Sequence, residues 1–138
     1  MELNPHLSFD GQCEAAFKFY EKCLGGKIAF MMTYAESPMA EQAPPGFGSK
    51  IMHATFALDG QRFYGGDAPP GQYAKPQGFT VALGIKDPAE ADRVFAALAE
   101  SGVVQMPIQE TFWALRFGAV VDQFGTPWMV NCEKPASG

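Results

Sequence analysis

Positive charge is scarce in this sequence. Among 138 residues only 10 are Lys or Arg, against 15 Asp or Glu, and the formal net charge is -5. Nucleic-acid binding depends on a dense basic patch, and no run of basic residues occurs here. We therefore expect no nucleic acid among the partners of this protein. A mildly acidic surface favours solubility, and it can also favour a cationic ligand, an alternative that the sequence leaves open.

Long apolar runs are also missing. No stretch reaches the roughly 18 apolar residues that a membrane-spanning helix needs. The first five residues, Met-Glu-Leu-Asn-Pro, have no basic start and lead into no long apolar run, so they do not resemble a signal peptide. We expect a cytoplasmic protein with no membrane partner.

Cysteine is sparse as well, with three residues at Cys13, Cys23 and Cys132. An odd number without a pairing pattern favours reduced thiols in a cytosolic protein over a disulfide framework. Cys13 and Cys23 stand ten positions apart on a predicted helix, too far along its axis to be bridged. We expect small core or surface thiols rather than a redox pair.

What the chain does contain is an internal repeat. In each half a helical stripe of apolar residues leads to a glycine, and the second half follows the first at an offset of about 75 residues. Each half is too small to bury a good core alone, so we expect the two to pack as one body with a cleft between their sheets. The stripes are Ala16, Phe17, Tyr20 and Leu24 before Gly25, and Ala91, Val94, Phe95 and Leu98 before Gly102.

Hydrophobic periodicity and turn residues predict the elements of each half. In the first half we expect strands over residues 3–9, 27–34, 51–58 and 61–65 and a helix over 13–24. In the second half we expect strands over 79–86, 103–110, 113–121 and 127–133 and a helix that Asp87 caps and that ends near Gly102. The predicted fold class is α+β, with two βαβββ modules forming a sheet-lined cleft. We expect one domain over residues 1–138, made of module 1 (about 3–67), a linker (68–78) and module 2 (about 79–133).

The repeated unit resembles the vicinal oxygen chelate superfamily, which includes glyoxalase I, ring-cleaving dioxygenases and the bleomycin and fosfomycin resistance proteins. Five segments are similar to motifs of its PhnB-like branch, and the resemblance covers about residues 3–133. The resemblance implies a sheet-lined cleft that is often completed by dimerisation, so we expect a homodimer, whose partner covers open strand edges. The segments are Pro5–Gly11, Ala16–Tyr20, Leu24–Gly26, Gln109–Trp113 and Asp122–Trp128.

Metal-dependent members of that superfamily take four ligands, His, Glu or Gln, from the first and last strands of the modules. The resemblance places these positions near residues 4–6, at Tyr64 or Gly65, at Thr80 and at Met129. Only His6 could serve as a ligand, because Thr and Met are poor ligands for a hard divalent ion. We therefore expect no metal and no cofactor. Members of the branch have carried a demethylubiquinone methyltransferase label, but no Gly-rich nucleotide loop follows a parallel strand here, so the sequence does not support S-adenosylmethionine chemistry.

The histidines are the main chemical candidates. If Ala54 and Phe56 meet the helices, strand alternation sends His53 and Thr55 to the opposite face, where His6 and Ser8 should also lie. Histidine can act as a base or a ligand near neutral pH, although a hydrogen-bonded histidine without a catalytic role remains an alternative. The candidate ligand-binding residues are His6, Ser8, His53, Thr55, Tyr64, Thr80, Trp113 and Met129.

Other residues are expected to serve the structure. Trp128 alternates with Val130 along a strand, which predicts core packing. Asp122 precedes Gly125 and should shape a turn. The Pro- and Gly-rich segment 36–49 is long for a compact domain and should cover part of the cleft mouth.

We therefore predict a PhnB-like vicinal oxygen chelate protein of unassigned activity that binds a small molecule in its cleft without a standard metal site. The alternative is a glyoxalase- or dioxygenase-type enzyme that acts on a small oxygenated metabolite, with His6 or His53 as general base or in an unusual metal site. A dimeric scaffold without a ligand is a third reading. The sequence does not decide whether the protein is an enzyme, and it assigns no catalytic residue.

Overall fold

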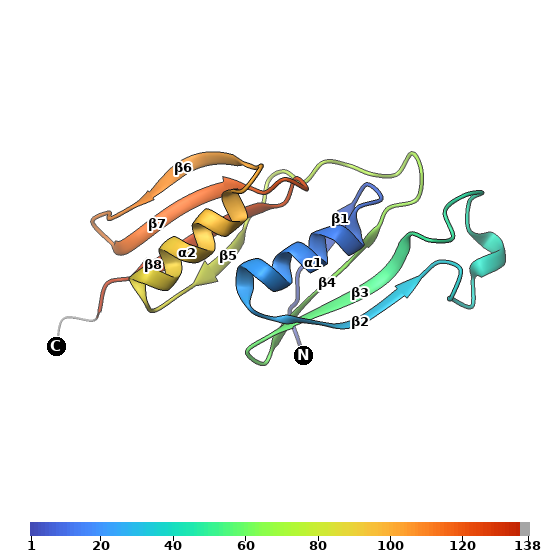
Figure 1. Cartoon of the computed structure of the whole chain (residues 1–138), viewed down its shortest axis with the longest axis horizontal. Helices are drawn as coiled ribbons and strands as arrows, with labels where there is room; N and C mark the ends of the chain where they lie inside the picture. The colour runs from blue at the N-terminus through green and yellow to red at the C-terminus, as the bar shows by residue number, and fades with distance from the viewer. Residues whose placement is uncertain (136–138) are drawn as a thin grey trace. The chain divides into compact units, whose positions relative to one another are not determined.

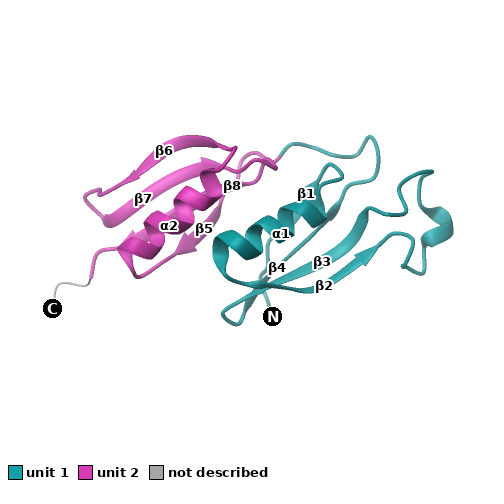
Figure 2. Ribbon diagram, in the orientation of Figure 1, with its two compact units in different colours: residues 1–75 teal, residues 76–138 magenta. Residues whose placement is uncertain are grey.

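The computed structural model describes residues 1–135 and divides the chain into two compact units between Lys75 and Pro76 (Figure 2). Unit 1 contains β1 (His6–Phe9), α1 (Cys13–Leu24), β2 (Lys27–Thr33), the short 3-10 turn η1 (Ala40–Gln42), β3 (Ile51–Leu58) and β4 (Gln61–Asp67). Unit 2 contains β5 (Val81–Gly84), α2 (Pro88–Ala99), β6 (Val103–Gln109), β7 (Ala114–Val121) and β8 (Pro127–Glu133). Two similar βαβββ modules are present (Figure 1), which confirms the predicted α+β class.

Both units share one sheet topology. The strand order is β1-β4-β3-β2 in unit 1 and β5-β8-β7-β6 in unit 2. The first strand of each module runs parallel to the last one, and the remaining pairs are antiparallel. No helix of the described residues is long and apolar enough to cross a membrane. Each unit is described by itself, so the single domain with a shared cleft stays a prediction.

In unit 1, α1 packs on one face of the sheet through its apolar stripe. Phe17 and Tyr20 are fully buried, and Gly25 ends the helix in the left-handed conformation with a φ of 81°. Phe17 lies so close to the sheet that a Cβ on Gly65 would come within 2.7 Å of its ring. Phe56 and Phe63 stack with a centroid separation of 4.9 Å and complete this aromatic core.

Unit 2 repeats this arrangement with other residues. The Asp87 carboxylate accepts a hydrogen bond from the Ala89 amide and caps α2, as predicted. The ring of Phe95 lies over Gly118, where a Cβ would come within 2.7 Å of it. Large rings from the helix thus need a glycine beneath them in both sheets, because there is no room for a side chain at those two positions.

Asp122 shapes the β7–β8 turn, as predicted, and also anchors the core. Its carboxylate accepts hydrogen bonds from the amides of Phe124 and Thr126, and the Trp128 indole Nε1 donates to it at 2.8 Å. Trp128 is fully buried, which confirms its predicted core role. One carboxylate therefore accepts hydrogen bonds from two amides of the turn and from the buried indole N–H.

Asp67 plays the corresponding part in unit 1, although no local sequence pattern predicted this role. Its carboxylate is 3% exposed and accepts hydrogen bonds from the amides of Cys13 at 2.9 Å and Ile51 at 2.8 Å. The negative charge therefore lies at the N-terminus of α1, where the helix dipole favours it. Burial raises the pKa of the Cys13 thiol, and the charge of Asp67 raises it further, so this thiol stays protonated and unreactive.

Strands β1 and β5 begin two or three residues later than expected, and a proline marks each starting point. Pro5 has no N–H to give to the ladder, and β1 begins after it, which leaves Leu3 exposed. Thr80 would stand opposite Pro127, which likewise lacks an N–H, so β5 begins at Val81. The candidate residue Thr80 therefore precedes the strand on which we expected it.

The Asp67→Ala variant tests the anchor of unit 1. Two buried amides would lose a charged acceptor, so we expect the free energy of unfolding to fall by about 3 kcal/mol. Asp10→Ala removes the same group from an exposed position and should change stability by less than about 0.5 kcal/mol. Urea denaturation measures both, and equal stabilities for the two variants would contradict the anchor role.

Candidate functional site

The open face of unit 1 is the face of its sheet opposite α1. On β3, Ala54 and Phe56 are fully buried toward the helix, so His53 and Thr55 between them point the other way. On β1 the buried residues are Leu7 and Phe9, and the alternate ones belong to the open face. The residues of this face are His6, Ser8, Phe30, Met32, His53, Thr55 and Tyr64.

Strand register aligns part of this set in a row across all four strands. His6 pairs with Tyr64, Tyr64 pairs with Thr55, and Thr55 pairs with Phe30. Residues paired in this way project from the same side of a sheet with neighbouring Cβ atoms. His53 lies beside this row, on the same face of β3 as Thr55. The open face therefore groups Phe30 with four of the expected ligand-binding residues, namely His6, His53, Thr55 and Tyr64.

His53 lies between two aromatic rings on this face. Its imidazole centroid is 5.5 Å from that of Tyr64 and 6.1 Å from that of Phe30. Phe30 is 49% exposed, which is unusual for a phenylalanine in the middle of a strand. The three rings are tilted relative to one another by 46° and 32°, and together they form a partly apolar surface that remains accessible.

His53 also affects the titration of His6. The pKa of His6 is lowered from its ordinary value of 6.5, chiefly by burial and then by the charge that His53 can carry. Near neutral pH the His6 imidazole is therefore neutral, with one nitrogen free to accept a proton or a hydrogen bond.

Hydroxyl groups complete the chemistry of this face. Within residues 1–135, the side chains of Ser8, Thr55 and Tyr64 form no hydrogen bond to protein. Tyr34 differs, since its hydroxyl donates to the carbonyl of Asp67 at 2.8 Å and serves the fold. Ser8, Thr55 and Tyr64 therefore keep their hydrogen-bonding capacity for solvent or for a ligand.

The remaining candidates, Thr80, Trp113 and Met129, belong to unit 2. Met129 pairs with Ala119 on the face of the sheet opposite α2. Trp113 is 44% exposed, and its ring centroid is 5.2 Å from that of Phe117. His6 belongs to unit 1, so a cleft in which it meets these three residues stays a prediction.

The four positions that the resemblance assigns to metal ligands do not form a fitting donor set. They hold one imidazole, a phenol or a glycine, a hydroxyl and a thioether, which do not suit a hard divalent ion. Among the described residues no three or more His, Cys, Asp or Glu side chains are placed to hold a metal. The expectation that this site works without a metal stays a prediction.

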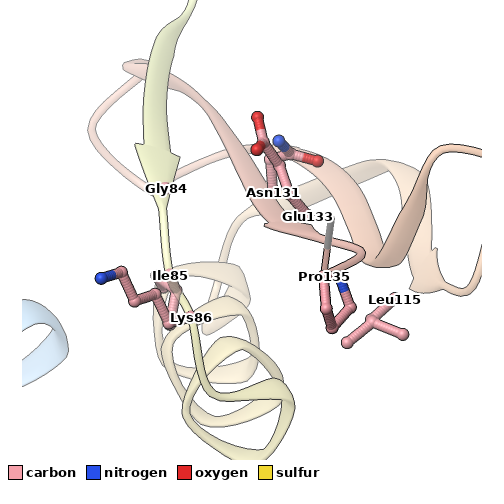
Figure 3. A pocket seen from close by; sticks show the side chains of 7 residues that line it. All are labelled: Gly84, Ile85, Lys86, Leu115, Asn131, Glu133 and Pro135. Atoms are coloured by element: carbon pink, nitrogen blue, oxygen red, sulfur yellow. The ribbon is translucent and has the colours of Figure 1, made fainter. Parts of the chain in front are cut away.

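Sequence reasoning missed a cavity in unit 2. It has a volume of about 500 Å³ and lies beside the ends of β5 and β8 (Figure 3). Asn131 and Glu133 contribute its polar wall, and both share the strand alternation of Met129. A polar residue between the buried Val130 and Cys132 was the signal that could have revealed this wall.

Comparison with known proteins places the chain among close relatives. The family model described as 3-demethylubiquinone-9 3-methyltransferase matches residues 1–131. Protein YjdN of Escherichia coli is 38% identical over 97% of both chains. Protein PA1353 of Pseudomonas aeruginosa is 40% identical, with a TM-score of 0.89 over 98% of this chain and 99% of that one.

Two further structures extend the likeness. A putative 3-demethylubiquinone-9 3-methyltransferase, PhnB protein, from Bacillus cereus is 26% identical, with a TM-score of 0.80 over 96% of this chain and 99% of that one. A glyoxylase/bleomycin resistance protein/dioxygenase domain from Frankia is 12% identical, with a TM-score of 0.64 over 97% and 98%. The second of these shows the fold alone, and it agrees with the βαβββ repeat.

The coupling of the two histidines can be measured by NMR titration. We expect the pKa of His6 to lie below 6.5 and to rise partway toward 6.5 in His53→Gln, since burial remains when the charge is removed. A lowered pKa means that the unfolded chain binds the proton first. The contribution of His6 to stability is therefore fully present above pH 6.5 and is lost as the pH falls from there through the lower pKa of the folded state. An unchanged His6 titration in His53→Gln would contradict the coupling.

Proposed function

We propose that this chain, which belongs to the 3-demethylubiquinone-9 3-methyltransferase family in the PhnB-like branch of the vicinal oxygen chelate superfamily, binds a small molecule without a metal. The proposed site is the open face of unit 1. The observation that carries the proposal is the position of the His53 imidazole between the rings of Phe30 and Tyr64, where its charge lowers the pKa of His6. Such an accessible ring cluster contributes nothing to the core on the other side of the sheet.

The chemistry of the face indicates the kind of ligand. Three adjacent rings favour a planar or apolar portion by stacking and burial of apolar area. A neutral His6 can accept a hydrogen bond, and the hydroxyls of Thr55 and Tyr64 can donate or accept. A small oxygenated metabolite with a flat or apolar part and at least one hydroxyl fits this combination.

Catalysis by His6 is the second candidate function. A histidine that is neutral near pH 7 and lies on an accessible face can act as a general base. In that case His6→Gln would abolish turnover while ligand binding weakened only modestly. The name of the family describes a methyltransferase, but the sequence contains no Gly-rich nucleotide loop after a parallel strand, and we do not propose methyl transfer.

A homodimer and a cytoplasmic location belong to the same proposal. Strand β6 is an edge strand, and its residues Val103, Val104 and Met106 are 65%, 45% and 41% exposed. A symmetric partner could cover this edge and its apolar residues. Cys13 and Cys132 are buried thiols, which supports a reducing compartment.

A thermal-shift screen of small oxygenated metabolites tests the proposed site. A compound that binds only the folded protein raises the unfolding midpoint. We expect His53→Ala to weaken the binding of such a compound by about tenfold, since losing a polar partner costs about 1–3 kcal/mol. Gln61→Ala, which changes an exposed residue of β4, should leave binding unaltered.

Repeating the thermal-shift measurement of such a compound after dialysis of the protein against EDTA distinguishes a metal-free site from a metal-dependent one. Undiminished affinity agrees with the proposal. Loss of binding that added zinc or nickel restores would contradict it and would favour an unusual metal site around His6. Full binding by the His53→Ala and His6→Ala proteins would place the site on another face.

A further inference from the structure

The cavity of unit 2 lies outside the site proposed above and shares no residue with it. It is bordered by the ends of β5 and β8, the start of β7 and the residues just after β8. Its volume of about 500 Å³ is in the usual range for small-molecule sites. Ile85, Leu115 and Pro135 supply an apolar wall, and Asn131 and Glu133 supply a polar one (Figure 3).

Asn131 has an unsatisfied polar atom in this wall. Its side-chain Oδ1 is buried and has no hydrogen-bond partner among the described residues. An unpaired buried acceptor costs about 1–3 kcal/mol, so native structures rarely keep one without a purpose. The torsion that orients the amide is broad, and a modest rotation turns the oxygen toward the cavity. A ligand that donates an N–H would then satisfy it.

Gly84 leaves the space beside Asn131 empty. The two residues are paired in the β5–β8 ladder, so their side-chain positions are neighbours. A Cβ built on Gly84 would meet no atom within 4 Å. This contrasts with Gly65 and Gly118, where packing against a helix leaves no room for a side chain. At Gly84 the missing side chain opens a cavity rather than relieving a clash.

Glu133 supplies a negative charge at the same wall. It follows Asn131 by two positions on β8, so both side chains leave the same face of the sheet. Glu133 forms no ion pair within residues 1–135. Lys86 also lines the cavity, but its side chain extends away from Asn131 and Glu133 in Figure 3. With the Asn131 amide rotated, the polar wall presents one carboxylate and one amide oxygen, both of which accept hydrogen bonds.

We propose that this cavity binds a small organic amine, with its ammonium group between Asn131 Oδ1 and Glu133 and its apolar body against Ile85, Leu115 and Pro135. An ammonium group has several N–H donors, so it can satisfy both acceptors at once. A charge-assisted hydrogen bond to the carboxylate makes the amine preferable to a neutral donor of the same shape. A carboxylate ligand would be repelled by Glu133.

Three probes of matched shape test this assignment, namely phenethylamine, 2-phenylethanol and phenylacetate. Each is titrated into the full-length protein labelled with nitrogen-15, and the amide signals of Gly84 and the Asn131 side chain are followed. We expect phenethylamine to shift both signals and to bind at least tenfold more tightly than 2-phenylethanol, with no binding of phenylacetate. Equal affinity for the alcohol, preference for phenylacetate, or no shift with any probe would overturn the proposal.

Matched variants assign the binding to these residues. Glu133→Gln should weaken phenethylamine binding about tenfold, whereas Glu100→Gln makes the same charge change at the exposed end of α2 and should have no effect. Gly84→Val fills the cavity and should abolish binding. Retention of binding by Gly84→Val, or equal affinities of the two glutamine variants, would count against the cavity as the site.

Asn131→Leu provides a second readout that does not depend on affinity alone. Removing an unsatisfied buried acceptor should leave the unfolding midpoint unchanged or raise it, while phenethylamine binding is lost. A residue that served only the fold would show the reverse, with a lower midpoint and unaltered binding. That pattern would contradict a ligand-binding role for Asn131.

Discussion

The buried carboxylate of Asp67 is the interaction on which unit 1 depends. It accepts hydrogen bonds from the first residue of α1 and from the first residue of β3, while belonging to the end of β4. Three elements distant in sequence are thereby fixed at one point. Because the helix is held at its N-terminus, its aromatic stripe stays on one face of the sheet, and the other face keeps its polar residues. Asp122 performs the same kind of anchoring in unit 2 through the Trp128 indole.

One helix for each four-stranded sheet leaves half of the sheet surface uncovered within each unit. On the covered face the rings of Phe17 and Phe95 press so closely that glycine is required beneath them. On the uncovered face of unit 1 a large apolar side chain remains accessible, with Phe30 49% exposed. Exposed aromatic groups beside histidine and hydroxyl groups are typical of recognition surfaces. The fold therefore places the core on one face of the sheet and leaves the other face for the binding that we propose.

Local patterns in the sequence were sufficient for most of the fold. The apolar stripe, the Asp87 cap and the terminal glycine predicted α1 and α2 because these signals act within a few residues. Strand alternation predicted that His53 and Phe56 lie on opposite faces of the sheet, and the residues around Asp122 predicted that it shapes a turn. The limits of β1 and β5 were missed because they depend on prolines and on partner strands elsewhere in the chain.

Long-range geometry explains what the sequence could not reveal. Asp67 contacts Cys13 across 54 positions, and nothing near either residue announces the contact. The cavity of unit 2 exists because Gly84 is paired with Asn131, a partnership that only the parallel ladder creates. The aromatic neighbours of His53 come from β2 and β4, so its surroundings follow from register and not from its own segment. The chemistry of each residue could be predicted from the sequence, whereas its neighbours in the folded structure could not.

Chemical footprinting of the histidines tests most directly whether the open face of unit 1 is the binding face. Diethylpyrocarbonate modifies accessible neutral imidazoles, and mass spectrometry reports the extent at His6 and His53 separately. In the free protein both should react. In the presence of a metabolite that raises the unfolding midpoint, both should be protected in proportion to its occupancy. Modification of both histidines at undiminished rates, while that metabolite is bound at saturation, would contradict the account.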